Sequence, residues 1–211
     1  MTGLDGPSKF EAMLPFKRQT VESIEKKLKD ATGEEKSLSL AKLREIFAGD
    51  AVWADLKDNG HLLVKILGTD YFKAEDGQIS RDALILYSLI LSVGTPKIKA
   101  RVFYDVLQDN NQEFISASDK DFEGAYSTLI DLATKLLYAN LSLVSSEKPK
   151  LSELDKVDGL KDTWNETFLD DVYGAASKLS RVEWEAKVSS SMKWLFDSKT
   201  LRAKVEKELN L

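Results

Sequence analysis

Residues 94–116 read GTPKIKARVFYDVLQDNNQEFIS, and the signals in this stretch recur along the 211-residue chain. Thr95 and Pro96 indicate a helix start, because threonine caps the first turn and proline fits the first helical position. Apolar residues then follow at helical spacing, at Val102, Phe103, Val106 and Leu107. A polar loop leads to Ile115-Ser116, where the serine is placed to cap another helix. The stretch therefore predicts a helix, a polar loop and a second helix.

The same pair of an apolar residue and a serine precedes three other predicted helices, at Leu38-Ser39, Ile79-Ser80 and Leu179-Ser180. Ser180 stands three residues before Glu183, which is the spacing of a capping box. The first three pairs are spaced nearly evenly, and a polar linker at residues 141–157 explains the longer interval before the last. We therefore predict an all-α fold of four helix-loop-helix units, whose second helices cover residues 40–47, 83–91, 122–138 and 184–196.

The composition excludes several kinds of site. The chain has no cysteine, which excludes disulfides and thiolate zinc sites. Its one histidine, His61, excludes a multi-histidine metal site, and a catalytic triad would depend on that residue alone. The sequence has neither a glycine-rich phosphate loop nor a nucleophile elbow. We therefore predict a protein that is not an enzyme. Its net charge of −5 disfavours nucleic acid as a partner.

The sequence carries no signal for secretion or membrane insertion. Its first residues have neither a basic start nor an apolar core. The longest strongly apolar run, residues 83–93, is about half of the ~20 residues that a membrane-spanning helix needs. We expect an intracellular, cytoplasmic protein that does not insert directly into a membrane.

The four units resemble the four-EF-hand proteins of the calmodulin superfamily. In that family an apolar residue at loop position 8 forms a short β-bridge with the partner loop, and position 9 caps the exiting helix. Residues 94–116 and the long interval before the last unit are similar to the recoverin-like and calcineurin-B-like subfamilies. The resemblance implies paired EF-hand-like units in two lobes, residues 10–93 and 94–197, with very short β-bridges between their loops. A flexible N-terminus at 1–9 and a C-terminal helix at 198–211 complete the expected organisation.

The loops of this resemblance are predicted not to bind calcium tightly. Calcium needs six to eight oxygen ligands, with carboxylates at the first and last of the twelve loop positions. The last position is Lys42 in loop one and Ala83 in loop two. The first position lacks an acid in every loop, being Ala31, Phe72, Gln108 and Val172. We therefore expect no metal and no cofactor.

A weak calcium site in loop three or four is the alternative. Loop three is rich in side-chain oxygens but has a single carboxylate, and its candidate ligands are Gln108, Asn110, Gln112, Ser116 and Asp119. Glu183 stands at the last position of loop four, but Val172 opposite favours the capping-box interpretation. With such a site the protein would be a regulatory calcium sensor.

Residues 82–93 are apolar nearly all round, so a helix there must be covered on all sides. The favoured interpretation is a core helix between the two lobes. The alternative is that its residues line a groove for a partner helix, together with a stripe near the C-terminus. The groove candidates are Leu84, Tyr87, Leu91, Trp184, Met192, Trp194 and Leu195.

The leading hypothesis is a calcium-independent EF-hand-like interaction module or structural subunit. Its partner would be a protein, either an amphipathic helix or a neighbouring subunit of a larger assembly. A helical adaptor unrelated to EF-hands is the structural rival, and it would be favoured if the four apolar-serine pairs did not meet as short β-bridges.

Overall fold

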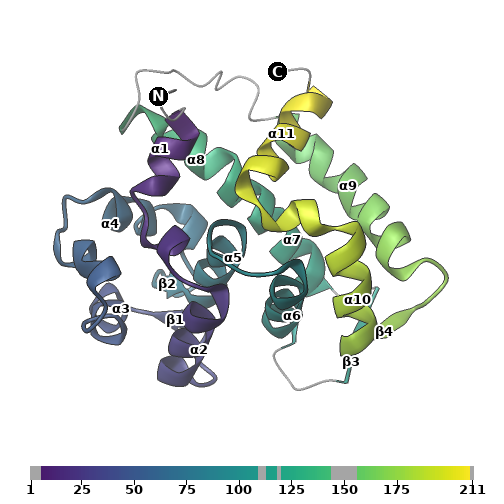
Figure 1. Cartoon of the computed structure of the whole chain (residues 1–211), viewed down its shortest axis with the longest axis horizontal. Coiled ribbons are helices and arrows are strands. Elements are labelled where there is room, and N and C mark those ends of the chain that lie inside the picture. The colour runs from purple at the N-terminus through teal and green to yellow at the C-terminus, as the bar shows by residue number, and fades with distance from the viewer. Residues whose placement is uncertain (1–5, 109–112, 118–119, 144–155, 210–211) are drawn as a thin grey trace.

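The structure is a computed structural model of the whole chain, and it describes residues 6–108, 113–117, 120–143 and 156–209. This described part is mostly helical, and its strands form two short antiparallel pairs (Figure 1). The predicted all-α class is confirmed. No helix within these residues is long and apolar enough to cross a membrane.

The first half of the chain runs from α1 to α5. Its elements are α1 (Gly6–Ala12), η1 (Pro15–Arg18), α2 (Val21–Thr32), β1 (Ser37–Leu38), α3 (Leu40–Ile46), η2 (Ala51–Lys57), α4 (Leu62–Leu67), η3 (Asp70–Phe72), β2 (Ile79–Ser80) and α5 (Arg81–Leu91).

The second half runs from α6 to α11. Its elements are α6 (Pro96–Leu107), β3 (Phe114–Ser116), α7 (Lys120–Ala133), α8 (Lys135–Asn140), η4 (Leu141–Leu143), α9 (Lys156–Tyr173), β4 (Lys178–Ser180), α10 (Arg181–Ser191), η6 (Lys193–Phe196) and α11 (Ser198–Leu209).

The four apolar-serine pairs meet two by two in the short strands. Leu38 lies opposite Ile79 in the β1–β2 pair, and Ile115 lies opposite Leu179 in the β3–β4 pair. All four apolar side chains are buried, so each strand pair is anchored in the core. Three of the four serines cap the helix that follows: the hydroxyls of Ser39, Ser80 and Ser180 each accept a hydrogen bond from the backbone N–H three residues on. For Ser116 that N–H belongs to Asp119, which lies outside the described residues, and α7 is described from Lys120 on.

Two predicted helices are each divided in two. The helix expected at residues 122–138 is interrupted at Thr134, whose hydroxyl donates a 2.6 Å hydrogen bond to the carbonyl of Ile130. Such back-bonding by threonine competes with regular helix geometry. The helix expected at 184–196 ends at Ser191, because Ser189 and Ser190 also bond to backbone carbonyls, and η6 continues the chain.

The ends of the chain also differ from expectation. Helix α1 begins at Gly6, so residues 6–9, expected to be flexible, are helical. Phe10 is fully buried and holds this helix to the core. At the other end α11 occupies the place of the expected C-terminal helix. Part of the expected linker is also structured, since η4 covers Leu141–Leu143 and α9 begins at Lys156, while residues 144–155 lie outside the described residues.

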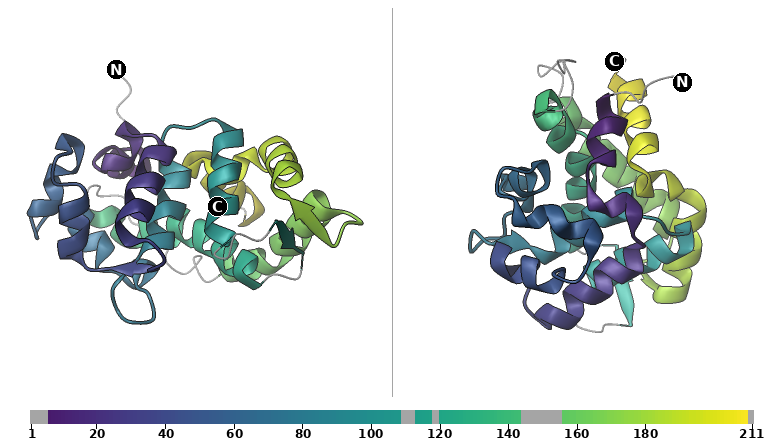
Figure 2. Two further views of the ribbon diagram at one scale, coloured as in Figure 1. Left: turned by 90° about the horizontal axis from the view of Figure 1, so that it is seen from below. Right: turned by 60° about the vertical axis from the view of Figure 1, so that its left-hand side comes forward.

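Helix α5 lies at the centre of the molecule. It packs against α2 of the first half and against α6 and α7 of the second (Figures 1 and 2). Nearly every one of its side chains is buried, as an all-round apolar helix requires. The two halves therefore share one hydrophobic core.

Candidate functional site

The first pair of loops is closed by a carboxylate that faces serine and backbone groups. Ser37 Oγ donates a 2.6 Å hydrogen bond to Asp76 Oδ2, and the backbone N–H of Gln78 donates to Asp76 Oδ1 at 2.9 Å. Gly77, with φ of +78°, provides the left-handed turn between them. These bonds, that of Ser37 foremost, lower the pKa of Asp76 below its ordinary value of 3.8. Both oxygens of this acid are therefore engaged within the protein.

In loops two and four, the side chain at the first of the twelve loop positions is part of the core. Phe72 and Val172 are both fully buried, and the Phe72 ring packs edge-on against Tyr87 with the ring centroids 5.5 Å apart. Buried apolar side chains offer no oxygen to a metal. At the last position of loop one, Lys42 forms an ion pair of 3.3 Å with Glu45. Loops two and four thus lack a ligand at the first position, and loop one has a cation at the last.

A buried arginine links the start of α5 to the first loop. Arg81 is almost fully buried, and its Nη1 donates a 3.0 Å hydrogen bond to the carbonyl of Gly33. Its backbone N–H donates to the carbonyl of Lys36 at 2.8 Å. A cation of the chain itself therefore binds a carbonyl of loop one.

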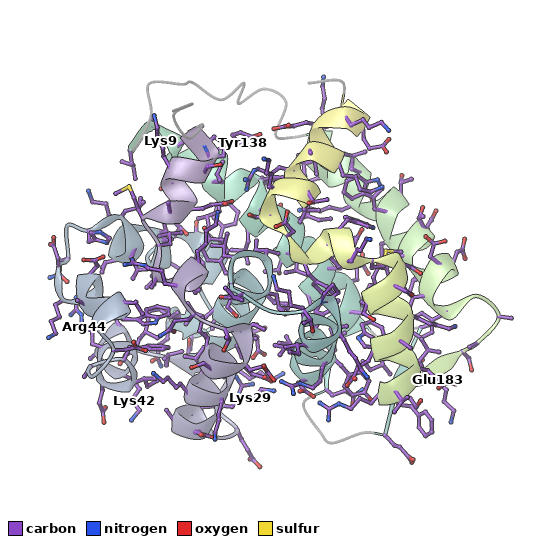
Figure 3. All side chains as sticks on the ribbon, viewed as in Figure 1. Lys9, Lys29, Lys42, Arg44, Tyr138 and Glu183 are labelled. Atoms are coloured by element: carbon purple, nitrogen blue, oxygen red, sulfur yellow. The ribbon has the colours of Figure 1, made fainter. Side chains whose placement is uncertain are left out.

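Glu183, in the first turn of α10, completes the predicted capping box (Figure 3). Its Oε2 accepts hydrogen bonds from the backbone N–H of Ser180 at 2.9 Å and from the Ser180 hydroxyl at 2.6 Å. These bonds lower the pKa of Glu183 below its ordinary value. The capping-box interpretation is confirmed, and it gives this carboxylate a helix-stabilising role.

Loop three is described only in part. Asn110, Gln112 and Asp119, three of its candidate calcium ligands, lie outside the described residues. Gln108 Nε2 donates to the carbonyl of Phe114 at 3.0 Å, and Ser116 Oγ donates to the carbonyl of Ser177 at 3.4 Å. Among the described residues no group of three or more His, Cys, Asp or Glu side chains is placed to hold a metal ion.

The groove proposed for a partner helix is not open in this structure. Trp194 is half-buried, and the other six candidates are buried in the core: Leu84, Tyr87, Leu91, Trp184, Met192 and Leu195. Trp184 is fully buried, its ring neighbours include Phe103 and Phe122, and its Nε1 donates to the carbonyl of Ala100. In this structure these six residues therefore line no open groove, because their side chains are part of the core.

The single histidine serves as a helix cap. His61 Nδ1 accepts a 3.2 Å hydrogen bond from the backbone N–H of Leu63 at the start of α4. Its Nε2 lies 3.5 Å from Asp55 Oδ2. This position is structural, and nothing about it indicates a nucleophile.

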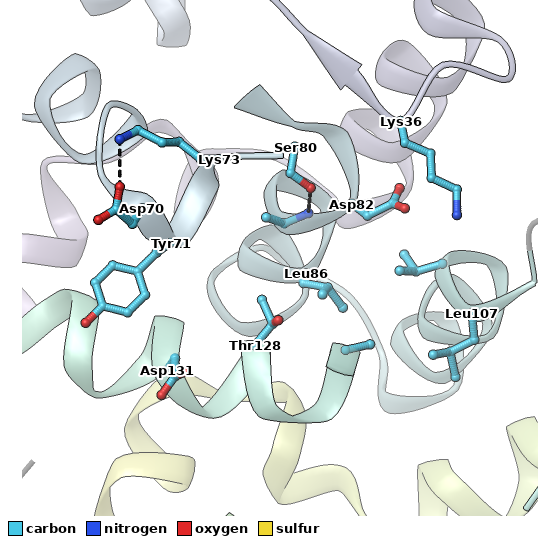
Figure 4. Close-up of a pocket in the computed structure, with 13 residues that line it drawn as sticks. Lys36, Asp70, Tyr71, Lys73, Ser80, Asp82, Leu86, Leu107, Thr128 and Asp131 are labelled. Atoms are coloured by element: carbon cyan, nitrogen blue, oxygen red, sulfur yellow. Dashed lines mark hydrogen bonds and ion pairs between the residues drawn. The ribbon is translucent and has the colours of Figure 1, made fainter. Parts of the chain in front are cut away.

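A cavity of about 420 Å³ lies where the two halves meet, between η3, β2 and α5 on one side and α6 and α7 on the other (Figure 4). Leu86 and Leu107 give it an apolar surface, while Lys36 and Asp82 stand on one side of it. Tyr71 and Asp131 stand on the other side. The cavity can therefore accommodate a group that combines apolar and charged parts.

The charges around this cavity are largely satisfied within the protein. Lys73 Nζ lies 2.6 Å from Asp70 Oδ1, and Arg81 Nε lies 2.9 Å from Asp82 Oδ1. Lys161 Nζ approaches Asp131 to 2.7 Å. Burial raises the pKa of Tyr71 above its ordinary value, and Asp131 raises it further. The cavity thus combines apolar side chains with paired charges, which is a lining suited to binding.

Sequence reasoning missed this cavity. Its residues come from separate segments of the chain, and each, such as Tyr71, Thr128 or Asp131, belongs to an ordinary helical or turn pattern. No local signal could have brought them together.

Comparison with known proteins gives no relative: no family model, no curated protein and no solved structure matches this chain. The function must therefore be argued from the site itself.

Proposed function

We propose that this protein is a calcium-independent EF-hand-like interaction module, which recognises an amphipathic helix or a neighbouring subunit of a larger assembly. The observation that carries the proposal is the way the paired loops are closed. Leu38 pairs with Ile79 and Ile115 with Leu179, as the loops of paired EF-hands would. The contacts around them come from side chains of the chain and need no ion.

The internal contacts take the places that calcium ligands would hold. Asp76 bonds to Ser37, Glu183 bonds to Ser180, and Phe72 and Val172 lie in the core. Calcium sensors work because ion binding opens a helix pair and exposes apolar residues. A module whose loops are closed by its own side chains has one conformation with or without calcium.

The cavity of Figure 4 is the surface we assign to recognition of the partner. It is preformed, and it joins apolar side chains such as Leu86 and Leu107 to charged ones. Its carboxylates, Asp70, Asp82 and Asp131, are paired with cations of the chain, and Lys36 lies beside them. A basic amphipathic helix would place apolar side chains against Leu86 and Leu107, and its cations would compete with those of the chain for the three carboxylates. The net charge of −5 favours the approach of such a partner.

Titration with melittin, a basic amphipathic helix, tests this assignment when binding is measured by calorimetry in the presence of chelator. We expect binding to the native chain and loss of binding in Thr128→Arg, which places a large cation in the cavity. Thr167→Arg on α9 is the matched control, because both threonine hydroxyls bond to a backbone carbonyl four residues earlier in a helix. Binding that requires calcium, or that survives in Thr128→Arg, would contradict the proposal.

A further inference from the structure

Two tryptophans enclose a lysine ammonium at the C-terminal end of the molecule. Trp164 on α9 and Trp194 on η6 meet edge to face, with their ring centroids 5.5 Å apart. Lys204 on α11 places its Nζ 5.0 Å from the Trp164 centroid and 4.8 Å from the Trp194 centroid. Both distances lie within the range of a cation–π interaction, which extends to about 6 Å. The two indoles therefore form an aromatic cage for a cation.

The ammonium of Lys204 is held by the indoles alone among the described residues: it has no ion pair and no hydrogen bond there. Helix α11 is fixed by other contacts. Arg202 Nη1 lies 2.5 Å from Glu11 Oε1, and Tyr138 Oη donates to Glu206 Oε1 at 2.5 Å. Leu201 and Val205 are buried beneath the helix. The Lys204 side chain can therefore leave the cage without the helix moving.

The cage persists when the lysine leaves it. Trp164 is buried, and it is positioned by α9, whose Phe168 and Val172 lie in the core. Trp194 is half-buried between the core residues Met192 and Leu195. A cation site with rigid aromatic walls loses little conformational entropy when it binds a ligand.

A quaternary ammonium suits this cage better than a lysine does. The lysine ammonium is compact and strongly hydrated, so enclosing it between two rings removes favourable contacts with water. Methyl groups spread the charge and contact the ring faces directly, which is why aromatic cages bind quaternary ammonium groups.

We propose that Trp164 and Trp194 form a binding site for a quaternary ammonium group, which Lys204 occupies in the absence of ligand. The site lies on different elements from the loops and from the cavity of Figure 4, so the inference does not rest on the proposed function. Lysine acts as a competitor within the chain, because a ligand must displace its side chain before it contacts the rings.

The test follows the four indole N–H signals of the protein by NMR during titration with choline, in chelator. We expect the signals of Trp164 and Trp194 to shift, while those of Trp53 and Trp184, which are buried elsewhere, stay fixed. Lys204→Ala should bind choline about 5-fold to about 30-fold more tightly than the native chain, since one or two cation–π contacts no longer compete. Lys207→Ala, an exposed lysine on the same helix, is the matched control and should bind as the native chain does.

Titrations with two other ligands distinguish the effect of the ligand's charge from that of its shape, and identify the source of the ligand. The neutral alcohol 3,3-dimethylbutan-1-ol has the shape of choline without its charge, and we expect it to bind at least about 5-fold more weakly. Trimethyl-lysine, titrated in parallel with choline, distinguishes a modified side chain from a free head group by which of the two binds more tightly. Trp194→Leu in the Lys204→Ala background keeps an apolar side chain and should abolish binding. Any one of three results would overturn the proposal. They are equal choline affinity of the native chain and Lys204→Ala, equal affinity for the alcohol and for choline, and no shift of the Trp164 and Trp194 signals.

Discussion

Ser37 Oγ lies 2.6 Å from Asp76 Oδ2, and this hydrogen bond joins the two loops of the first strand pair. Asp76 stands where an EF-hand-like loop would direct a carboxylate to its ion, and a serine of the other loop takes up that carboxylate. The same principle applies to Glu183, whose carboxylate is taken up by Ser180. In our account the loops keep their pairing because hydrogen bonds replace coordination.

Removing the serine hydroxyl should change the ionisation of Asp76. We expect Ser37→Ala to raise the pKa of Asp76 toward its ordinary value of 3.8, because the Ser37 hydrogen bond is the largest cause of the lowered pKa. An NMR titration of the Asp76 carboxyl carbon between about pH 2 and pH 6 measures the pKa directly. An unchanged pKa would show that the hydroxyl does not support this carboxylate.

Variants of the capping box at the start of α10 distinguish a structural role of Glu183 from a metal-binding role. Ser180→Ala should lower the free energy of unfolding by about 1 kcal/mol, as loss of a helix cap does. Glu183→Gln should leave the melting temperature nearly unchanged, because glutamine can also accept the hydrogen bonds of a capping box. Thermal melts in chelator and in calcium measure both variants. A calcium-induced stabilisation of the native chain that Glu183→Gln abolishes would assign Glu183 to a metal.

From the buried Lys99 we predict how the free energy of unfolding changes in alkaline solution. Its Nζ is buried and donates a 2.8 Å hydrogen bond to the carbonyl of Phe196, and burial lowers its pKa from 10.5 to about 8. Between these two pH values the unfolded chain binds more protons than the folded chain. The contribution of Lys99 to the free energy of unfolding therefore rises with pH. We expect the native chain to gain on the order of 2 kcal/mol relative to Lys99→Met between about pH 7 and pH 10. Urea unfolding across this range provides the test, and a constant difference between the two proteins would refute it.

The ion pair of Glu11 with Arg202 joins the first helix to the last and is almost fully buried. Arg202→Met should lower the free energy of unfolding by about 2 kcal/mol, because the buried Glu11 carboxylate loses one of two charged partners and keeps Lys17, 2.6 Å away. The double variant Glu11→Gln with Arg202→Met should be more stable than Arg202→Met alone, since the carboxylate is then neutralised. Arg181→Met, which removes a partly exposed ion pair with Asp105, is the control and should cost about 1 kcal/mol or less. A cost for Arg202→Met as small as that of the control would show that the pair does not hold the termini.

The sequence predicted those features that local chemistry determines. A serine that directly precedes a helix can accept a bond from its first turn, so the caps at Ser39, Ser80 and Ser180 could be predicted from the sequence. At Ser116, which has the same pattern, the cap stays a prediction, because Asp119 lies outside the described residues. The break at Thr134, where the backbone has φ of −117° and ψ of −77°, was missed, because the apolar pattern continues across it from Ile130 to Leu137. For Trp184, the helical spacing of the apolar residues favoured a place in the core, and the side chain is fully buried.

The cavity and the aromatic cage depend on contacts between distant segments. Lys36 and Asp131 line the same cavity although they lie in different halves of the chain. Trp164, Trp194 and Lys204 come from three separate elements. Each of these residues fits its own helix, and the sites arise only when the helices pack. Patterns within one helix therefore carry no signal for them.

Calorimetric titration of the metal-stripped protein with calcium, paired with thermal melts in millimolar calcium and in chelator, tests the central claim most directly. Our account predicts no heat of binding and the same melting temperature in both solutions, because the described residues of the loops offer no group of acids placed to hold a metal ion. A saturable heat at micromolar calcium, together with a raised melting temperature, would contradict the account. The protein would then be a calcium sensor whose site includes residues of loop three.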